Sequence, residues 1–335
     1  MINDPILLLG GSGIVGRRTA QFLRAANPTA PVLIGGRDLA RASDVAAGIG
    51  HAEGVALDLA ADDLGLGGRP VGAVAIFLKD DTLAALRFAQ ARKVPHISIS
   101  SGTFEIAPEV SAYIHNPTAA PVVLGSEWLA GAATLPALEF VKAFGRVDDI
   151  TIGVLLDEQD IGGPAAAIDL HRLTEVAPTA LPRRDGAFFW RVGDEARATY
   201  RAVDGTEMEA FAYSPFDIAA LSAATGAPNV QVNIAVGVSS TRRRGEPMST
   251  EIILDLAGED HAGQPLRTRH AIVHPEGQAP LTALGVTMML ERLVGLDGKP
   301  PSPAGLYLPE HLVDPAEYLR RLEQIGGTVS KAEVQ

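Results

Sequence analysis

Short apolar runs alternate with amphipathic segments over the first 125 residues. The runs are nearly free of charge, which is typical of strands buried on both faces of a parallel sheet. They predict strands at residues 6–9, 32–36, 54–58, 72–78, 94–100 and 122–125. The segments between them predict helices at 17–25, 39–49 and 82–92, and another from 126 to about 144. This alternation indicates an α/β fold with a doubly wound parallel sheet.

The pattern changes after residue 146. Longer runs of period two predict strands at 150–156, 188–192, 231–238, 250–256 and 268–274. Helices do not alternate with these strands, which favours a mixed or antiparallel sheet in a second, α+β domain. Two last helices are predicted at 278–294 and 315–325. We expect a Rossmann domain at 1–125, a substrate and dimerisation domain at 126–299, and a C-terminal segment, 300–335, that packs back on the first domain.

A glycine-rich turn follows the first strand. Gly11, Gly13 and Gly16 fit the spacing G-x-G-x-x-G. In dinucleotide sites these glycines allow a tight turn, close approach to the pyrophosphate and close packing of helix on strand. The following helix would offer its N-terminal amides to phosphate. Since strand, turn, helix and second strand fall at the required distances, the segment predicts a dinucleotide-binding βαβ unit.

The end of the second strand indicates which dinucleotide binds. NAD enzymes place a carboxylate there for the ribose 2′-hydroxyl, whereas an arginine accommodates the 2′-phosphate of NADP. This chain has Gly36, Arg37 and Asp38 at that point, with Arg41 one helical turn later. The sequence therefore favours NADP over NAD. Asp38 leaves two alternatives open, a cap of the next helix or a contact with the ribose.

The cofactor is expected beyond the C-terminal ends of the parallel strands, where ligands of doubly wound sheets lie. Asp58 ends the third predicted strand and Leu78 ends the fourth. The full set of expected cofactor-binding residues is Gly11, Ser12, Gly13, Ile14, Val15, Gly16, Gly36, Arg37, Arg41, Asp58 and Leu78.

Composition narrows the class of protein further. The 335 residues include no cysteine, which excludes disulfides, thiol catalysis and cysteine-ligated metals. The net charge of −12 argues against a nucleic-acid partner. No apolar run reaches the length of about eighteen residues that a membrane span needs, and the first strand begins without a leader pattern. We expect a cytoplasmic enzyme with no membrane partner.

Several phrases resemble the saccharopine-dehydrogenase-like reductases. The resemblance rests on the glycine turn, the phrase at 35–42, Asp58, the strand at 96–100 and the C-terminal phrase at 305–310. It covers nearly the whole chain, with specific motifs in the first third. The resemblance implies an NAD(P)-dependent oxidoreductase whose second domain closes the cleft and often forms a dimer. Members act on amino-acid imines and opines, and some relatives reduce carbon–carbon double bonds. Relatives commonly carry a proline-containing loop and an Asp where this chain has Lys79-Asp80-Asp81 and Ser98.

The short-chain dehydrogenases are a rival family, because Gly10, Gly13 and Gly16 also fit their looser spacing. Those enzymes use Tyr-x-x-x-Lys, in which the lysine lowers the pKa of the tyrosine so that it can exchange a proton. None of the tyrosines here has a lysine four positions later. A protein of that family would therefore be a catalytically inactive regulator.

Lys79 and Glu127 are the candidates for proton chemistry. Lys79 follows the buried fourth strand on the cofactor side, where a lysine can donate a proton or bind a carboxylate. A salt bridge to Asp80 or Asp81, or a solvated position, is the alternative. Glu127 lies just beyond the sixth strand, at a predicted helix start. His96 opens the fifth strand at the edge away from ligands, so we expect it to be structural.

Three residues are candidates for substrate contacts. Trp128 could form a wall of the nicotinamide pocket or pack between the domains. Asp157 and Asp160, on a glycine-bearing loop, could receive a substrate ammonium or cap the helix that follows. His270 and His274 would lie about 13 Å apart along a strand, so we expect no metal site.

These patterns together predict an NADPH-dependent reductase. It would transfer hydride to or from a C=N or C=O bond of a small, amino-acid-derived substrate, and we expect it to be a homodimer. Two alternatives stay open. One is an enoyl reductase that acts in trans on a carrier-bound chain, which would need a long apolar groove. The other is a non-catalytic NADP-binding regulator.

Overall fold

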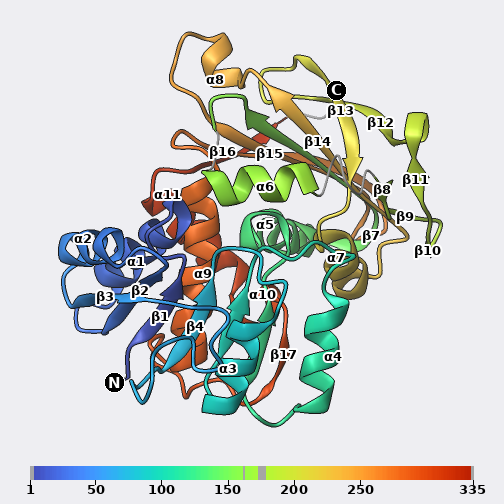
Figure 1. Cartoon of the computed structure of the whole chain (residues 1–335). Coiled ribbons are helices and arrows are strands. Elements are labelled where there is room, and N and C mark those ends of the chain that lie inside the picture. The colour runs from blue at the N-terminus through green and yellow to red at the C-terminus, as the bar shows by residue number, and fades with distance from the viewer. Residues whose placement is uncertain (1–3, 161–162, 173–178, 333–335) are drawn as a thin grey trace. The chain divides into compact units, whose positions relative to one another are not determined.

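The computed structural model describes residues 4–160, 163–172 and 179–332 of the chain (Figure 1). Its chain divides into two compact units. The first unit comprises residues 1–126 and 282–313, and the second comprises 127–281 and 314–335. Each unit therefore contains two separate stretches of sequence.

An all-parallel sheet forms the centre of the first unit, with the strand order β17-β6-β5-β4-β1-β2-β3. The order from β3 to β6 is that of doubly wound dinucleotide-binding sheets. The strands are β1 (Ile6–Leu9), β2 (Val32–Gly36), β3 (Ala52–Ala56), β4 (Ala73–Ile76), β5 (His96–Ser98), β6 (Pro121–Leu124) and β17 (Gly305–Tyr307). All residues of β1, β4 and β6 are buried, as their apolar runs predict.

Helices pack against this sheet, with α2 on β2 and β3 and α3 on β4 and β5. The helices of the unit are α1 (Ile14–Ala26), α2 (Leu39–Ile49), α3 (Ala84–Arg92), α4 (Ala107–His115), α10 (Pro309–Leu312) and most of α9 (Gln278–Val294). One core cluster joins Leu7 and Ile76 of the sheet to Phe88 of α3. A hydrogen bond of 2.9 Å from Asn27 to Glu291 ties the end of α1 to α9.

The second unit is built on a mixed sheet. Its central strand, β7 (Phe144–Asp157), runs parallel to β14 (Asn229–Gly237) and antiparallel to β15 (Thr250–Asp260). The remaining strands of the sheet are β9 (Arg183–Arg184), β10 (Ala187–Phe188), β12 (Arg197–Arg201), β13 (Glu207–Tyr213), β16 (Pro265–His274) and β18 (Thr328–Ala332). A separate two-stranded ribbon pairs β8 (Thr179–Ala180) with β11 (Arg191–Val192). The parallel sheet of the first unit and the mixed sheet of the second confirm the predicted α/β class and its division into a parallel and a mixed sheet.

The helices of the second unit are mostly short. They are η1 (Trp128–Ala130), α5 (Thr134–Phe140), η2 (Val141–Ala143), α6 (Pro164–His171), η4 (Gly193–Ala196), α7 (Asp217–Thr225), α8 (Ser240–Arg243) and α11 (Pro315–Gln324). The single helix expected from 126 to 144 is broken because Leu129, Ala130 and Gly131 all have positive φ. Phe144 already belongs to β7. The expected strand at 188–192 is likewise divided between β10 and β11.

The C-terminal segment is divided between the units, whereas we expected it to pack back on the first. Residues 305–307 join the parallel sheet as β17, beside β6. From Asp314 onward the chain belongs to the second unit, where α11 packs on α5 and β18 pairs with β16. The residues of β18 alone do not show where it lies, because its position depends on hydrogen bonds to β16, far away in the sequence.

Candidate functional site

The glycine turn between β1 and α1 is built from backbone alone. Gly10 has φ +84°, and the Gly13 amide donates to the Gly10 carbonyl at 2.9 Å. A Cβ on Gly16 would lie 2.7 Å from the Gly10 carbonyl oxygen and the Gly11 Cα. A Cβ on Gly11 would lie 2.7 Å from the Leu8 carbonyl oxygen. Two of the three motif glycines are therefore required by packing.

The N-terminus of α1 is suited to an anion. Its N-cap is Gly13, which has no side chain to occupy the amides of the first turn, and the turn carries no acidic residue. Ile14, the first helical residue, is 54% exposed. Backbone N–H groups at such a helix start carry partial positive charge and bind phosphate oxygens. Ser12 to Gly16 thus form a cradle that fits the pyrophosphate of a dinucleotide.

The basic residues after β2 lie next to this cradle. Arg41 Nη2 donates to the Ser12 carbonyl at 3.3 Å, and a Cβ on Gly36 would lie 3.5 Å from Ser12 Oγ. Arg37 is exposed at the strand end. The Asp38 side chain accepts from the Arg41 amide at 3.1 Å and is the N-cap of α2. Of the two alternatives for Asp38, the structure therefore shows the helix cap.

Asp58 and Leu78 lie at the same edge of the sheet. Asp58 is exposed, and its carboxylate accepts from the Ala60 amide at 2.9 Å, so it closes its own turn. Leu78 packs against the glycine turn, with Cδ2 at 3.4 Å from the position of a Cβ on Gly10. Strands β3 and β4 end two residues before the predicted ends, and both residues therefore belong to loops.

Lys79 extends from the loop after β4, next to Leu78. Its side chain is only 17% exposed. Its Nζ donates to Ser101 Oγ at 3.2 Å and lies 3.9 Å from Glu105 Oε2. The expected partners have other roles, since Asp80 accepts from the Thr82 and Ala85 amides at the start of α3 and Asp81 is exposed.

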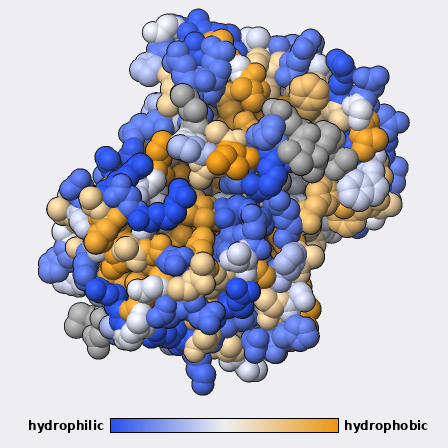
Figure 2. Space-filling model, viewed as in Figure 1, coloured by the Kyte–Doolittle hydropathy of each residue, from blue (hydrophilic) through white to orange (hydrophobic). Residues whose placement is uncertain are grey.

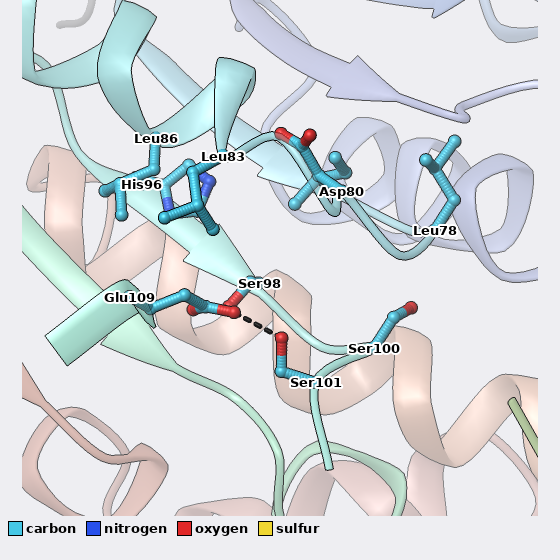
Figure 3. A pocket seen from close by; sticks show the side chains of 10 residues that line it. Leu78, Asp80, Leu83, Leu86, His96, Ser98, Ser100, Ser101 and Glu109 are labelled. Atoms are coloured by element: carbon cyan, nitrogen blue, oxygen red, sulfur yellow. Dashed lines mark hydrogen bonds between the residues drawn. The ribbon is translucent and has the colours of Figure 1, made fainter. Parts of the chain in front are cut away.

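A buried carboxylate completes this group. Glu109 of α4 is 3% exposed, and its two oxygens accept from the hydroxyls of Ser98 and Ser101. Figure 3 shows the three side chains turned toward one another beside the end of β5. A small pocket adjoins them and is also lined by Asp80, His96 and Ser100. Glu109 was not among the predicted site residues, because α4 itself was not predicted. The pattern Ala-Pro-Glu at a helix start is the signal that could have shown it.

His96 lines this pocket beside Leu83 and Leu86 (Figure 3). Neither ring nitrogen has a hydrogen-bond partner among the described residues. Burial lowers the pKa of His96 to about 4, against a smaller opposing effect of Asp80. The ring is therefore neutral at physiological pH, which fits the expected structural role.

Glu127 and Trp128 begin the second unit and are both buried, 4% and 7% exposed. The Trp128 amide donates to Asp217 Oδ2 at 2.5 Å, and its ring meets Tyr213 edge-on, with centroids 5.7 Å apart. Asp217 is fully buried and also accepts from Thr134 at 2.8 Å. Asp217 was not among the predicted site residues, because its place at the start of the apolar helix α7 resembles that of a simple cap.

Asp157 ends β7 with its side chain fully buried. It accepts from the Ser239 amide and from Arg242 Nη1, both at 2.8 Å, and from the Gln159 amide at 2.9 Å. Burial alone would raise the pKa of Asp157, but these hydrogen bonds outweigh it and hold the pKa below its usual value. Its partner Arg242 belongs to α8. These bonds give Asp157 a structural role.

Asp160 caps a helix, but not the one expected. Its Oδ2 accepts from the Gln278 amide at 2.7 Å, at the start of α9 rather than of α6. Burial raises the pKa of Asp160. Gly277 lies so close that a Cβ there would be 2.5 Å from Asp160 Oδ2. Asp160 therefore fixes the start of α9.

Metal-binding clusters and membrane spans are both absent from the described residues. No group of three or more His, Cys, Asp or Glu side chains in that part of the chain is arranged to hold a metal ion. Within the same ranges, no helix is long and apolar enough to cross a membrane.

Comparisons with known proteins agree with the fold. No protein-family model matches the chain, and no curated protein matches it significantly. Saccharopine dehydrogenase (L-Glu forming) from Saccharomyces cerevisiae is similar in structure, with TM-score 0.65, 14% identity and coverage of 99% of this chain and 100% of that one. An oxidoreductase from Agrobacterium radiobacter, solved with NAD+, L-tartaric acid and magnesium, has TM-score 0.50 and 13% identity over 95% and 93% of the two chains. The chain thus has a saccharopine-dehydrogenase-like fold, and the resemblance seen in the sequence is confirmed at this level.

Proposed function

We propose that this protein is an NADPH-dependent oxidoreductase. The observation that carries the proposal is the anion cradle at the start of α1 with arginines beside it. Ser12 to Gly16 would hold the pyrophosphate, and Arg37 and Arg41 would receive the 2′-phosphate. The fold shared with saccharopine dehydrogenase, and with an oxidoreductase solved with NAD+, supports the same assignment.

Charge reversal at Arg37 tests the cofactor assignment. Arg37→Asp removes a charge-assisted contact to the 2′-phosphate, so NADPH affinity should fall about tenfold or more. NADH affinity should stay within about threefold, because NADH lacks that phosphate. Calorimetric titration with both cofactors measures the two effects. Arg87→Asp, an equal charge change at an exposed position of α3, is the matched control. Equal losses for NADPH and NADH would overturn the role of Arg37.

Lys79 is the proposed proton donor. A bound reduced nicotinamide supplies a hydride to the carbon of a C=N or C=O bond. Lys79 gives the matching proton from Nζ to the nitrogen or oxygen, and becomes a neutral amine until solvent reprotonates it. Its chain neighbour Leu78 packs against the glycine turn, which supports this role. Lys79→Met should lower kcat by about 100-fold or more while NADPH affinity is unchanged.

A small carbonyl or imine derived from an amino acid is the proposed substrate class. Screening imines, keto acids and enoyl thioesters for NADPH oxidation tests it. Turnover of a carrier-bound enoyl chain alone would favour the trans-acting enoyl reductase. Tight NADPH binding without turnover of any class would favour the non-catalytic regulator.

A homodimer is the proposed assembly, as the family resemblance implies. Exposed apolar side chains on the second unit, among them Phe188, Phe211 and Val236, support a contact surface there. In Figure 2 hydrophobic patches interrupt the hydrophilic surface over this part of the chain. Sedimentation that gives a monomer at micromolar concentration would overturn the assignment.

A further inference from the structure

Lys79 is held by a chain of hydrogen bonds that ends on a buried charge. The chain runs from Lys79 Nζ to Ser101 Oγ, and from the Ser101 hydroxyl to Glu109. Only the lone pairs of Ser101 Oγ face Lys79, because its one hydrogen is donated to the carboxylate. Glu109 thereby fixes Ser101 as an acceptor for the lysine.

The burial of Glu109 needs a reason. A buried carboxylate is costly unless hydrogen bonds compensate it. Glu109 is 3% exposed, and the bonds that compensate it come from two serines at the end of β5. That end is the edge of a parallel sheet at which ligands bind. A group that served packing alone could be apolar at this position.

The other charged groups near Lys79 are placed differently. Glu105 is the direct ion-pair partner at 3.9 Å, and its Oε2 also accepts from the Gly102 amide at 2.8 Å. Asp80 is bound to amides of α3, and His96 is neutral. Glu109 therefore acts on Lys79 through Ser101, whereas Glu105 acts on it directly.

We propose that Glu109 and Ser101 are positioning residues that hold Lys79 in place as proton donor to the substrate. This rests on the proposed function of Lys79. Ser101 restrains the lysine Nζ, and Glu109 restrains Ser101. The pair would hold the Lys79 side chain in one rotamer, so that Nζ presents its proton in one direction.

The test is the acetylation rate of each lysine, measured by mass spectrometry on the cofactor-free protein at a fixed pH. The chain has five lysines, and Lys93, Lys142, Lys299 and Lys331 serve as internal references. We expect Lys79 to react most slowly in the native protein. Ser101→Ala and Glu109→Gln should each raise its rate about fivefold or more, with the references unchanged. Ser101→Thr, which keeps the hydroxyl, should retain the slow rate.

Ser98→Ala is the matched control, because it removes the other hydroxyl from Glu109 and leaves the Ser101 contact intact. The Lys79 rate should not change in this variant. An unchanged Lys79 rate in Ser101→Ala or Glu109→Gln would overturn the proposal and leave Glu109 as a structural link between β5 and α4. A rise at all five lysines would also overturn it, since it would report general loosening.

A catalytic readout follows once a substrate is found. Glu109→Gln should lower kcat about tenfold with little change in KM, since it disturbs the donor and not the binding contacts. NADPH binding by these variants is measured separately. A native protein that does not bind NADPH would contradict the proposed function. The acetylation rates test the positioning pair whether or not NADPH binds.

Discussion

The two units use their charged residues differently. In the first unit, Arg37 is exposed at the end of β2, Arg41 bonds the glycine turn, and Lys79 reaches a serine at the ligand edge of the sheet. In the second, the charged residues at the ends of β7 and β15 bind one another or local backbone. Asp157 is bonded to Arg242, and Glu251, fully buried, accepts from Ser240. The chemistry we propose therefore lies in the first unit, and the acids of the second stabilise its structure.

The largest effect is expected at Asp157. Asp157→Ala removes the buried acceptor of the Ser239 amide and of Arg242, which keeps only the exposed Glu158. Breaking such a buried pair costs about 3–5 kcal/mol. Urea unfolding should show this loss, with NADPH affinity unchanged in the folded protein. Glu158→Ala is the matched control, because the exposed Glu158 binds the same arginine at 3.1 Å and should cost less than about 0.5 kcal/mol.

The pH dependence of Asp157 follows from the sign of its shift. Its pKa is lower in the folded protein than in the unfolded chain. The stabilisation is therefore complete above the unfolded value, near 3.9, and is lost as pH falls through the lower folded value. If the folded Asp157→Ala variant lost cofactor binding, this acid would have a functional role. That result would contradict the difference between the two units.

A second pH effect is expected from one histidine in each unit. It comes from burial, which disfavours the charged form of the ring, whereas the effect of Asp157 comes from hydrogen bonds that favour its charged form. Burial lowers the pKa of both His96 and His270 to about 4. The unfolded chain takes up these protons near pH 6.5, so stability falls as pH drops from about 6.5 to about 4. For the fully buried His96 the loss is about 3 kcal/mol. His96→Leu should flatten that part of a urea-unfolding series, and His270→Phe should flatten it less. An unchanged slope in His96→Leu would contradict this account.

Much of the first unit could be predicted because its signals are local. The glycine turn, the buried strands and the α2 cap at Asp38 each depend on a few adjacent residues. The second unit was harder, since β12 and β13 carry charged residues within the strand and neither is apolar throughout its length. The roles of Asp157 and Asp160 depend on Arg242 and Gln278, which lie far along the chain. No local pattern could have shown those contacts.

The candidate site likewise contains residues that the sequence shows and residues that only the fold brings together. The proposed cofactor residues follow a spacing rule and could be named from the sequence, whereas the partners of Lys79 could not. Ser101 and Glu109 approach it only because the loop after β5 turns back toward the end of β4. Asp217, the partner of Trp128, is 89 residues away from it.

A smaller effect than those above is expected at Gly16. Gly16→Val would place side-chain atoms against the Gly10 carbonyl and the Gly11 Cα, each 2.7 Å from a Cβ. The turn must shift, so NADPH affinity should fall about 100-fold, or about 2.7 kcal/mol. Calorimetric titration measures the loss, with circular dichroism to show that the variant is folded. Affinity within about threefold of the native protein would mean that the turn is only a scaffold.

The smallest effect is expected at Gly48, an exposed glycine within α2 where an added Cβ would have no neighbour within 4 Å. Gly48→Ala should stabilise the protein by about 0.5–1 kcal/mol, because alanine favours the helix. Thermal unfolding measures the gain, and NADPH affinity should be unchanged. Destabilisation would show that α2 is more crowded than its surroundings indicate.

The central claim is that the first unit binds NADPH, and titration of the purified protein with NADPH and NADH tests it most directly. Calorimetry gives both affinities, and energy transfer from Trp128 and Trp190 to bound reduced cofactor gives an independent signal. We predict that NADPH binds at least about tenfold more tightly than NADH. A folded protein that binds neither cofactor would contradict the account.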